Sequence, residues 1–432
     1  MTNRVAADPE RLLPTSAAAP AGVETRRAGT LDEMWLIYLS NGLTMIAVSM
    51  FVRYADFVSL VGGGEAQLGL IVGVGMVGSL VMRLAQGVGI DRYGSRRIWL
   101  GSLAVYVASV LAHQFITSAF GPGIFLVRLA MQTALAGIFG ASITFVSRLV
   151  PPQRVAEMVG TVGISGFVGM LIGPQLADWI CGHGLVGHAE LNRLFQVAGL
   201  IALLAMAAAS LATRRESPPR FRPSKHVFDV FRQYRPGLIL AVAIAAGTGL
   251  NLPFTFLRTF AAERGLTSIG IFFSFYSVVA IVVRLLTRNL FERYGNRPWV
   301  IVGMVLLIAS LGCYLLVSHP WQWLLPGVLA GIAHALLFPS VVAAGSTVFP
   351  DQYRGLGTTL MLAMFDFGNL LGSPLVGGLL HGARSLHFPA YPTMLLIVGA
   401  LMAGIAAAYV IADRHRERTP ALPSVPDEAG EG

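Results

Sequence analysis

Three residues that carry or exchange charge stand inside long apolar stretches of the sequence: Asp366, His334 and Arg128. A carboxyl group or an imidazole in such surroundings can bind and release a proton, so Asp366 and His334 are candidates for coupling proton movement to another process. Arg128 cannot shed its charge and must meet an acid, carbonyl groups, water or an anionic solute. Structural roles are the alternatives: an ion pair or a protonated donor for Asp366, and a neutral hydrogen-bonded ring for His334.

The elements that position these residues must be surrounded by lipid. Of the 432 residues, 55% are hydrophobic and 12% are charged, and the mean hydropathy is +0.67, whereas a soluble domain is about 25% charged. Such an apolar excess does not fit inside the cores of two or three soluble domains. Cys181 and Cys313 each lie in an apolar run, a pattern that indicates neither a disulfide framework nor a zinc site.

Twelve stretches of the sequence are suited to the roughly 20 residues of a membrane-crossing helix. The first half contains 34–52, 66–82, 98–127, 129–147, 158–177 and 194–213. The second half contains 236–257, 265–283, two spans within 298–350 joined by a turn at Ser318-His319-Pro320, 355–383 and 385–412. We therefore predict an all-α membrane protein with twelve transmembrane helices in two pseudo-symmetric six-helix bundles.

These spans divide the chain into five segments. The sequence predicts an N-terminal bundle at 32–213 and a C-terminal bundle at 236–412, joined by a cytoplasmic linker at 214–235, with a disordered cytoplasmic tail at 1–31 and a charged cytoplasmic tail at 413–432. Most of the 31 Lys and Arg residues fall on the side of the two tails, which the positive-inside rule identifies as the cytoplasm. We expect a multi-pass protein of the inner or plasma membrane, with both termini cytoplasmic and no cleavable signal peptide.

The two halves repeat one pattern of residues. At an offset of 201 residues the aligned pairs are Arg83/Arg284, Asp91/Glu292, Arg92/Arg293, Tyr93/Tyr294, Gly94/Gly295 and Arg96/Arg297. A second match pairs Gly169, Gly173 and Pro174 with Gly368, Gly372 and Pro374. A parallel duplication of a six-helix unit explains both matches.

These motifs resemble those of the major facilitator superfamily over roughly residues 32–412. The loop after the second span, Gly87-Val-Gly-Ile-Asp91-Arg92-Tyr-Gly94-Ser-Arg96-Arg97, is similar to that family's most specific signature. The fifth span carries Gly160-x8-Gly169-x3-Gly173-Pro174, which resembles the signature of its drug/proton antiporter branches, with Ala177-Asp178 in place of two final glycines. Arg128 with Gln132 is similar to the family's Arg-x-x-Gln-Gly, and Gly331–Ser340 with Phe365–Gly368 looks like the sugar-efflux permeases.

The resemblance assigns a gate motif to the loop after the second span and to its repeat. Its residues are Gly87, Asp91, Arg92, Gly94, Arg96 and Arg97, with Glu292, Arg293 and Gly295 in the second half. Asp91 can accept hydrogen bonds from the N–H groups of a helix start. The resemblance implies that this helix is the eleventh span, near 355–359, so that the contact holds the cytoplasmic side shut. The alternative is that the arginines only set the orientation in the membrane.

The resemblance also places the first, fourth and seventh spans around a central cavity. A few polar groups on an apolar wall suit a neutral or amphipathic solute. The candidate cavity residues are Asn41, Thr44, Arg128, Gln132, Thr248, Asn251 and Thr255. Arg53 and Arg258, at the outer ends of two spans, are expected to extend to the outer interface without a further role.

Glycines predict close packing of helices. Gly166, Gly169 and Gly173 lie within about 60° of one another on a helix, whereas Gly160 lies on the other side. We assign the motif of Gly160, Gly169, Gly173 and Pro174 to helix packing, for which Gly169 and Gly173 supply the bare face, with a direct role in the transport cycle as the alternative. The run Gly73-Val-Gly75-Met-Val-Gly78 spells a dinucleotide fingerprint but lies inside an apolar span, where we expect it to pack helices.

The sequence therefore predicts a secondary transporter rather than an enzyme. It shows no Walker loop, no HExxH motif and no serine nucleophile elbow, and no cofactor or metal is expected. The net charge of +9 is spread over short loops, which argues against nucleic acid as a partner. The expected partners are the lipid bilayer, a small-molecule substrate and protons, and the expected state is a monomer. We expect proton-coupled efflux by alternating access; the alternatives are an uptake symporter for a sugar, organic acid or metabolite, and a non-transporting membrane sensor or assembly factor.

Overall fold

The computed structural model describes residues 31–150, 155–182, 186–216, 233–234, 236–287, 293–350 and 353–418. The tail predicted at 1–31, except for its last residue, lies outside the described residues, as do most of the predicted linker and the final part of the C-terminal tail. Glu292 of the predicted gate motif also lies outside them.

The first half of the chain forms six membrane-length helical units. The helices are α1 (Leu31–Ser49), which continues through the 3₁₀ turn η1 (Met50–Arg53) into α2 (Tyr54–Leu60), then α3 (Glu65–Tyr93), α4 (Ser95–Ala112), α5 (Pro122–Leu149), α6 (Val155–Cys181) and α7 (His188–Ala212). The second half contains α9 (Ile239–Glu263), α10 (Gly270–Leu286), α12 (Arg297–Cys313), α13 (Leu324–Ser346), α14 (Arg354–Ser385) and α15 (Ala390–Arg418).

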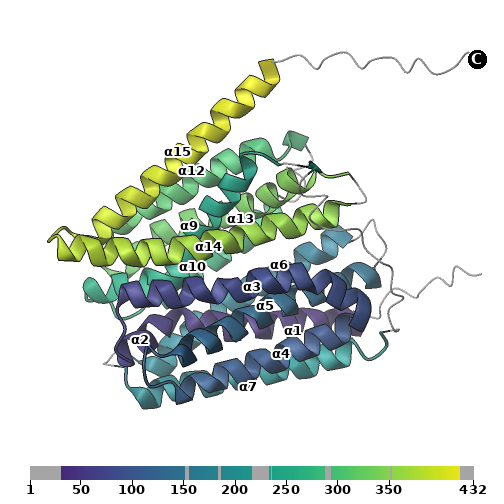
Figure 1. Ribbon diagram of the computed structural model, residues 1–432, viewed down its shortest axis with the longest axis horizontal. Helices are drawn as coiled ribbons and strands as arrows, with labels where there is room; N and C mark the ends of the chain where they lie inside the picture. The colour runs from purple at the N-terminus through teal and green to yellow at the C-terminus, as the bar shows by residue number, and fades with distance from the viewer. Residues whose placement is uncertain are drawn as a thin grey trace, which may run out of the picture.

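The helices form two bundles that lie side by side (Figure 1). The first bundle is coloured purple to teal and the second green to yellow, and α3 with α6 of the first contacts α14 with α10 of the second. Eleven helices of the described chain are long and apolar enough to cross a membrane, and α10, with 17 described residues, stands in the place of the remaining span. The predicted fold class, an all-α membrane protein of twelve spans in two bundles, is confirmed.

Glycines allow the two bundles to approach closely along α3 and α14. A Cβ atom on Gly73 would lie 2.8 Å from the Leu370 carbonyl oxygen, and one on Gly377 would lie 2.5 Å from the Glu65 carbonyl oxygen. Gly78, in the same glycine run as Gly73, faces the backbone of α5. The run that spells a nucleotide fingerprint therefore packs helices, because only a residue without a side chain permits backbones to approach this closely.

The internal repeat extends to the packing within each bundle. Gly169 on α6 faces the backbone of α1, and Gly368 on α14 faces the backbone of α9. The Ser49 hydroxyl donates to the Gly169 carbonyl at 3.0 Å, and the Thr248 hydroxyl donates to the Gly368 carbonyl at 2.8 Å. Both bundles thus join their first and fifth helices by a glycine contact and one hydroxyl bond. Gly160 takes no part, since a Cβ atom there would have no described atom of another residue within 4 Å.

This packing predicts opposite effects for one substitution at two places on α6. Gly169→Ala should lower the stability of the protein by about 1–3 kcal/mol, because its Cβ would lie 2.7 Å from the Gly42 carbonyl oxygen. Gly160→Ala should leave stability unchanged or raise it by up to about 1 kcal/mol, since alanine favours helix over glycine. Thermal unfolding of the two purified variants in detergent measures the difference, and equal unfolding temperatures would contradict the assigned contact.

Candidate functional site

Asp366 joins the two bundles near the middle of their interface. Its carboxylate forms an ion pair with the Nε group of Arg83 on α3, and the Ser79 hydroxyl donates to the same carboxylate oxygen. The Arg83 Nη2 group lies 3.4 Å from the second oxygen. Both charged side chains keep 13% of their surface exposed, so water or a proton can still reach the pair.

The chemistry of this pair depends on one proton. Arginine keeps its charge, so only Asp366 can change the charge of the pair. The ionised carboxylate attracts Arg83 strongly in surroundings of low dielectric constant, and protonation removes most of that attraction. An ion pair with this property across a bundle interface can therefore strengthen or weaken the contact between bundles when a proton binds or leaves.

His334, the second candidate for proton coupling, bonds to a neighbouring helix. Its Nδ1 atom forms a hydrogen bond with the Tyr276 hydroxyl on α10. Its ring packs edge-on against Phe167 on α6, with 5.1 Å between ring centroids, and against Phe338 at 5.7 Å. The contacts match the structural alternative for His334, a ring hydrogen-bonded between helices.

Arg128 lies deep in the first bundle with no acid beside it among the described residues. Its guanidinium carbon lies 4.5 Å from the centre of the Tyr54 ring, a cation–π contact. The side chain is 8% exposed, and Nε and Nη1 are buried without a hydrogen-bond partner in the described structure. A Cβ on Gly75 of α3 would lie 2.8 Å from the Arg128 side chain, so glycine at this position makes room for it.

Most of the uncharged candidates bond within one bundle. The Asn41 amide donates to the Val162 carbonyl at 2.8 Å and to the Ser165 hydroxyl at 2.9 Å, both on α6. Thr44 is fully buried and donates to the carbonyl of its own helix at Ser40. These contacts place Asn41 in the packing of α1 against α6, whereas Thr44 bonds within α1.

The candidate cavity residues of the second half, Thr248, Asn251 and Thr255, also form hydrogen bonds within their own bundle. Thr248 bonds to α14 as described above, and the Asn251 amide donates to the Thr255 hydroxyl at 3.0 Å and reaches the Ser373 hydroxyl at 3.5 Å. Gln132 is buried on α5, one turn from Arg128, beside Gly75. The described structure thus brings Gln132 together with Arg128 and Asn251 together with Thr255, and among the described residues no hydrogen bond joins candidates of one bundle to those of the other.

The gate motif adopts the predicted turn. Gly94 between α3 and α4 has φ +88°, and Gly295 has φ +71°, a region that favours glycine. The amides of Ser95 and Arg96, at the start of α4, donate to the Glu216 carboxylate at 3.1 and 2.6 Å. Glu216 therefore caps this helix start, an acidic contact that the sequence analysis did not identify.

The remaining arginines of the motif lie near the ends of their helices. Arg92 lies 5.4 Å from the centre of the Tyr93 ring, and Arg293 lies at the same distance from Tyr294 in the repeat. Arg97 is exposed, and Gly87 lies within α3.

Asp91 has a different partner from the expected helix start near 355–359. Its carboxylate pairs with the guanidinium of Arg148, at the end of α5 in the same bundle, at 3.0 Å. The Asp91 and Arg148 side chains are 43% and 39% exposed. A full positive charge at this distance attracts a carboxylate more strongly than the partial charge of a helix end, which accounts for the difference.

A cluster of four charges joins the bundles at the end of the molecule where α2 lies. We call Arg53, Asp56, Asp178 and Arg258 the charge lock. Arg53 lies 2.6 Å from Asp56 and 3.0 Å from Asp178, measured from its Nε and Nη1 atoms. Arg258 on α9 donates from Nε to both Asp56 oxygens at 3.0 Å.

The expectation that Arg53 and Arg258 extend to the outer interface is therefore corrected. Arg53 is 1% exposed, and two acids surround its guanidinium. The carboxylates of Asp56 and Asp178 compensate the Arg53 guanidinium for the water that it loses on burial, so Arg53 does not need to reach the membrane surface. The sequence signal for this cluster was Asp178, which stands where the related signature has a glycine.

Asp178 also caps a helix of the opposite bundle. Its Oδ2 atom accepts hydrogen bonds from the amides of Ile269 and Gly270, at 2.9 and 2.8 Å, and from the Ser268 hydroxyl at 2.9 Å. These amides belong to the start of α10, where exposed N–H groups and the helix dipole favour a negative charge. One carboxylate thus bonds to Arg53 in its own bundle and to the first turn of α10 in the other.

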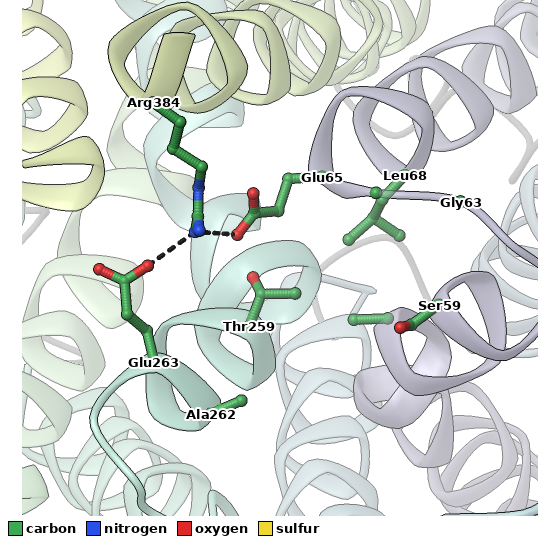
Figure 2. Close-up of a pocket in the computed structure, with 10 residues that line it drawn as sticks. Ser59, Gly63, Glu65, Leu68, Thr259, Ala262, Glu263 and Arg384 are labelled. Atoms are coloured by element: carbon green, nitrogen blue, oxygen red, sulfur yellow. Dashed lines mark hydrogen bonds and ion pairs between the residues drawn. The ribbon is translucent and has the colours of Figure 1, made fainter. Parts of the chain in front are cut away.

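A second polar contact joins the bundles at the same end (Figure 2). Arg384 on α14 donates to Glu65 on α3 at 2.8 Å and to Glu263 on α9 at 2.6 Å. The Tyr391 hydroxyl donates to Glu65 at 3.1 Å. These charges line a pocket of about 310 Å³, together with Thr259 and other residues of α2, α3 and α9. Ion pairs therefore hold the two bundles together around this pocket.

The family model described as Major Facilitator Superfamily matches this chain over residues 34–325 and 239–428. The chain belongs to the major facilitator superfamily. Among curated proteins of this superfamily, it is 23% identical over 373 residues to the "Multidrug resistance protein MdtG" of Salmonella paratyphi C (strain RKS4594), covering 83% of this chain and 90% of that protein. It is 23% identical over 384 residues to the "Uncharacterized MFS-type transporter YuxJ" of Bacillus subtilis (strain 168), covering 85% and 96%.

Solved structures of the superfamily share the fold. The nucleoside transporter NupG matches with a TM-score of 0.69 at 14% identity, covering 88% of this chain and 99% of that one. A bacterial homolog of the human lysosomal transporter Spinster, in an inward-facing and unoccupied conformation, matches with a TM-score of 0.69 at 16% identity, covering 90% and 98%. The family model and the curated relatives confirm the expected resemblance of this chain to the drug-efflux branches of the superfamily, and the solved structures confirm the fold.

The charge lock predicts that two Asp→Asn substitutions differ strongly in effect. Asp178→Asn should destabilise the protein by about 3–5 kcal/mol, because it leaves the buried Arg53 with one acidic partner fewer. Asp91→Asn should cost less than about 1 kcal/mol, since its ion pair is exposed to solvent. Unfolding temperatures of the purified variants in detergent measure both, and an Asp178→Asn variant as stable as Asp91→Asn would contradict the assigned lock.

Proposed function

We propose that this superfamily member is a proton-coupled exporter of a small neutral or amphipathic solute that works by alternating access. The observation that carries this proposal is the ion pair of Arg83 and Asp366 across the bundle interface. An acid that can be protonated, held by a cation that cannot lose its charge, gives a proton direct influence on the contact between the two bundles.

The proton acts through the strength of this pair. With Asp366 ionised, the attraction to Arg83 stabilises the present contact of α3 with α14. With Asp366 protonated, Ser79 and Arg83 lose the charge that they bind, and the two helices separate more easily. Binding of a proton on one side of the membrane and its release on the other then drives the bundles between two arrangements.

In the arrangement that the structure describes, the charge lock holds the two bundles together at the α2 end. The positive-inside rule orients the α2 end toward the outside of the cell. The lock and the Arg384 contacts then close the outer side, and solute exchanges with the cytoplasm. In the opposite arrangement the lock opens, and Asp91 leaves Arg148 for the start of α14 near 355–359, as the gate motif implies.

Export is favoured over uptake by the relatives. The protein MdtG, which matches 83% of this chain, is described as a multidrug resistance protein. Proton-coupled uptake of a sugar, organic acid or metabolite is the second candidate, because the fold is also shared with a D-xylose–proton symporter, at a TM-score of 0.70 and 16% identity.

The coupling role of Asp366 predicts that its replacement removes gradient-driven transport but not solute exchange. Asp366→Asn should abolish transport driven by a proton gradient, because the amide neither binds nor releases a proton near neutral pH, while solute counterflow without a gradient continues. Solutes that stabilise the purified protein against heat are selected first, and gradient-driven transport is then measured in proteoliposomes. Glu190→Gln, at a carboxylate that accepts the Gly187 amide at the start of α7, serves as the matched control and should transport as the wild type does.

A pH-sensitive dye inside acidified vesicles separates the candidate functions. Solute added outside should raise the internal pH if protons leave in exchange for solute. A further fall in internal pH indicates symport, and no change with any stabilising solute favours a non-transporting sensor or assembly factor. Gradient-driven transport by Asp366→Asn at the wild-type rate would contradict the coupling role.

A further inference from the structure

Arg284 on α10 is the repeat counterpart of Arg83, but its surroundings differ. The two arginines align in the internal repeat, and each lies where its helix contacts the opposite bundle. Arg83 meets Asp366 on α14. Arg284 meets Gly163 on α6 instead: a Cβ on that glycine would lie 3.4 Å from the guanidinium carbon and 3.5 Å from Nη2.

We call the contact of α3 with α14 the first interface and the contact of α6 with α10 the second interface. In the second interface, α6 has no acid at the position that corresponds to Asp366 on α14. Phe167 precedes Gly169 on α6 by two residues, just as Asp366 precedes Gly368 on α14. The repeat therefore places an aromatic ring where the first interface has a carboxylate. Among the described residues, none forms a hydrogen bond or an ion pair with the Arg284 guanidinium.

Arg284 stands in the last turn of the described α10, where a guanidinium without an acid needs water or a solute to balance its charge. Arg284 is half-buried, and none of its nitrogens belongs to the fully enclosed, unpartnered atoms of the described structure. Arg128, which also lacks an acid there, has two such enclosed nitrogens and packs against Tyr54. Of these two cations, Arg284 is the more exposed.

Aromatic side chains lie further along the same two helices, beginning with Phe167, four residues after Gly163 on α6. Phe167 on α6 packs on His334 at 5.1 Å between centroids, and the same histidine bonds to Tyr276, eight residues before Arg284 on α10. Phe338 on α13 packs against Phe365 on α14, with 5.1 Å between the ring centroids. A cation and a group of aromatic rings on the same pair of helices suit a molecule that has both a negative charge and an apolar body.

We propose that Arg284 binds the negatively charged group of the transported solute between α6 and α10, and that the solute is therefore an amphipathic organic anion. This inference rests on the proposed function and narrows its substrate class. The solute then completes in the second interface the ion pair that Asp366 provides in the first. A sulfonate, carboxylate or phosphate group offers the oxygen atoms that a guanidinium binds through paired hydrogen bonds.

Binding of three matched probes to the purified full-length protein tests the assignment. The probes are 2-naphthalenesulfonate, its neutral sulfonamide and the 2-naphthyltrimethylammonium cation, which share one aromatic body. The concentration dependence of the unfolding temperature gives each dissociation constant. The wild type should bind the sulfonate most tightly. Arg284→Gln should weaken sulfonate binding by about 10- to 100-fold, the range expected for hydrogen bonds to a charged group, and change sulfonamide binding little.

Two further variants make the result specific. Arg284→Lys keeps the positive charge and should retain part of the preference for the sulfonate, which a merely structural role of the arginine would not produce. Arg193→Gln removes a positive charge from an exposed position on α7 and should bind all three probes as the wild type does. Unfolding temperatures without ligand show whether each variant is folded.

Several results would overturn the proposal. These are equal sulfonate binding by wild type and Arg284→Gln, no preference of the wild type for the sulfonate, and no binding of any probe. Loss of sulfonate binding on addition of phosphatidylglycerol, but not of phosphatidylcholine, would assign the guanidinium to a lipid headgroup and also contradict it. The assay uses no proton gradient, so a failure of the coupling role of Asp366 leaves this comparison intact, and a failure here leaves the coupling result intact.

Discussion

The constraint on which this structure depends is that an arginine cannot lose its charge inside a membrane. The protein meets this constraint in four different ways. Arg53 is buried between two acids of its own bundle, and Arg83 pairs with an acid of the opposite bundle. Arg128 lies against an aromatic ring, and Arg284 lies over a glycine with no acidic partner among the described residues. Of these four arginines, Arg83 and Arg284 are those whose balance of charge a proton or a solute changes in the proposed cycle.

The two ends of the molecule are held by contacts of different strength. At the α2 end, Asp178 is buried, bonds to a cation and caps a helix of the other bundle. At the α3–α4 end, the Asp91 pair is exposed and remains within one bundle. Alternating access requires that such contacts form and break at opposite ends in turn. A buried lock at one end and a weakly held acid at the other are consistent with that cycle.

The sequence predicted the fold because its signals are local. Hydropathy gave the spans, and the repeated glycines indicated close packing on the fifth span of each bundle without naming the partner helix. It also marked Asp366 as the residue whose charge needs an explanation. Partners could not be predicted, because hydropathy reports the depth of a residue but not which distant side chain faces it. Nothing in the sequence indicates that Asn41 bonds to α6. Likewise nothing pairs Arg53 with Asp178, so its side chain was expected to extend to the outer membrane interface.

The central claim is that a proton on Asp366 controls the separation of the two bundles. Spin labels introduced by Arg214→Cys on the first bundle and Thr347→Cys on the second, both at exposed positions, report this separation in a protein whose Cys181 and Cys313 are replaced by Ala. Pulsed electron paramagnetic resonance then measures the distance between the labels as a function of pH. The account predicts that lowering the pH shifts the distance distribution of the otherwise unmodified protein and has no effect in the Asp366→Asn variant. An equal shift in both proteins would contradict it.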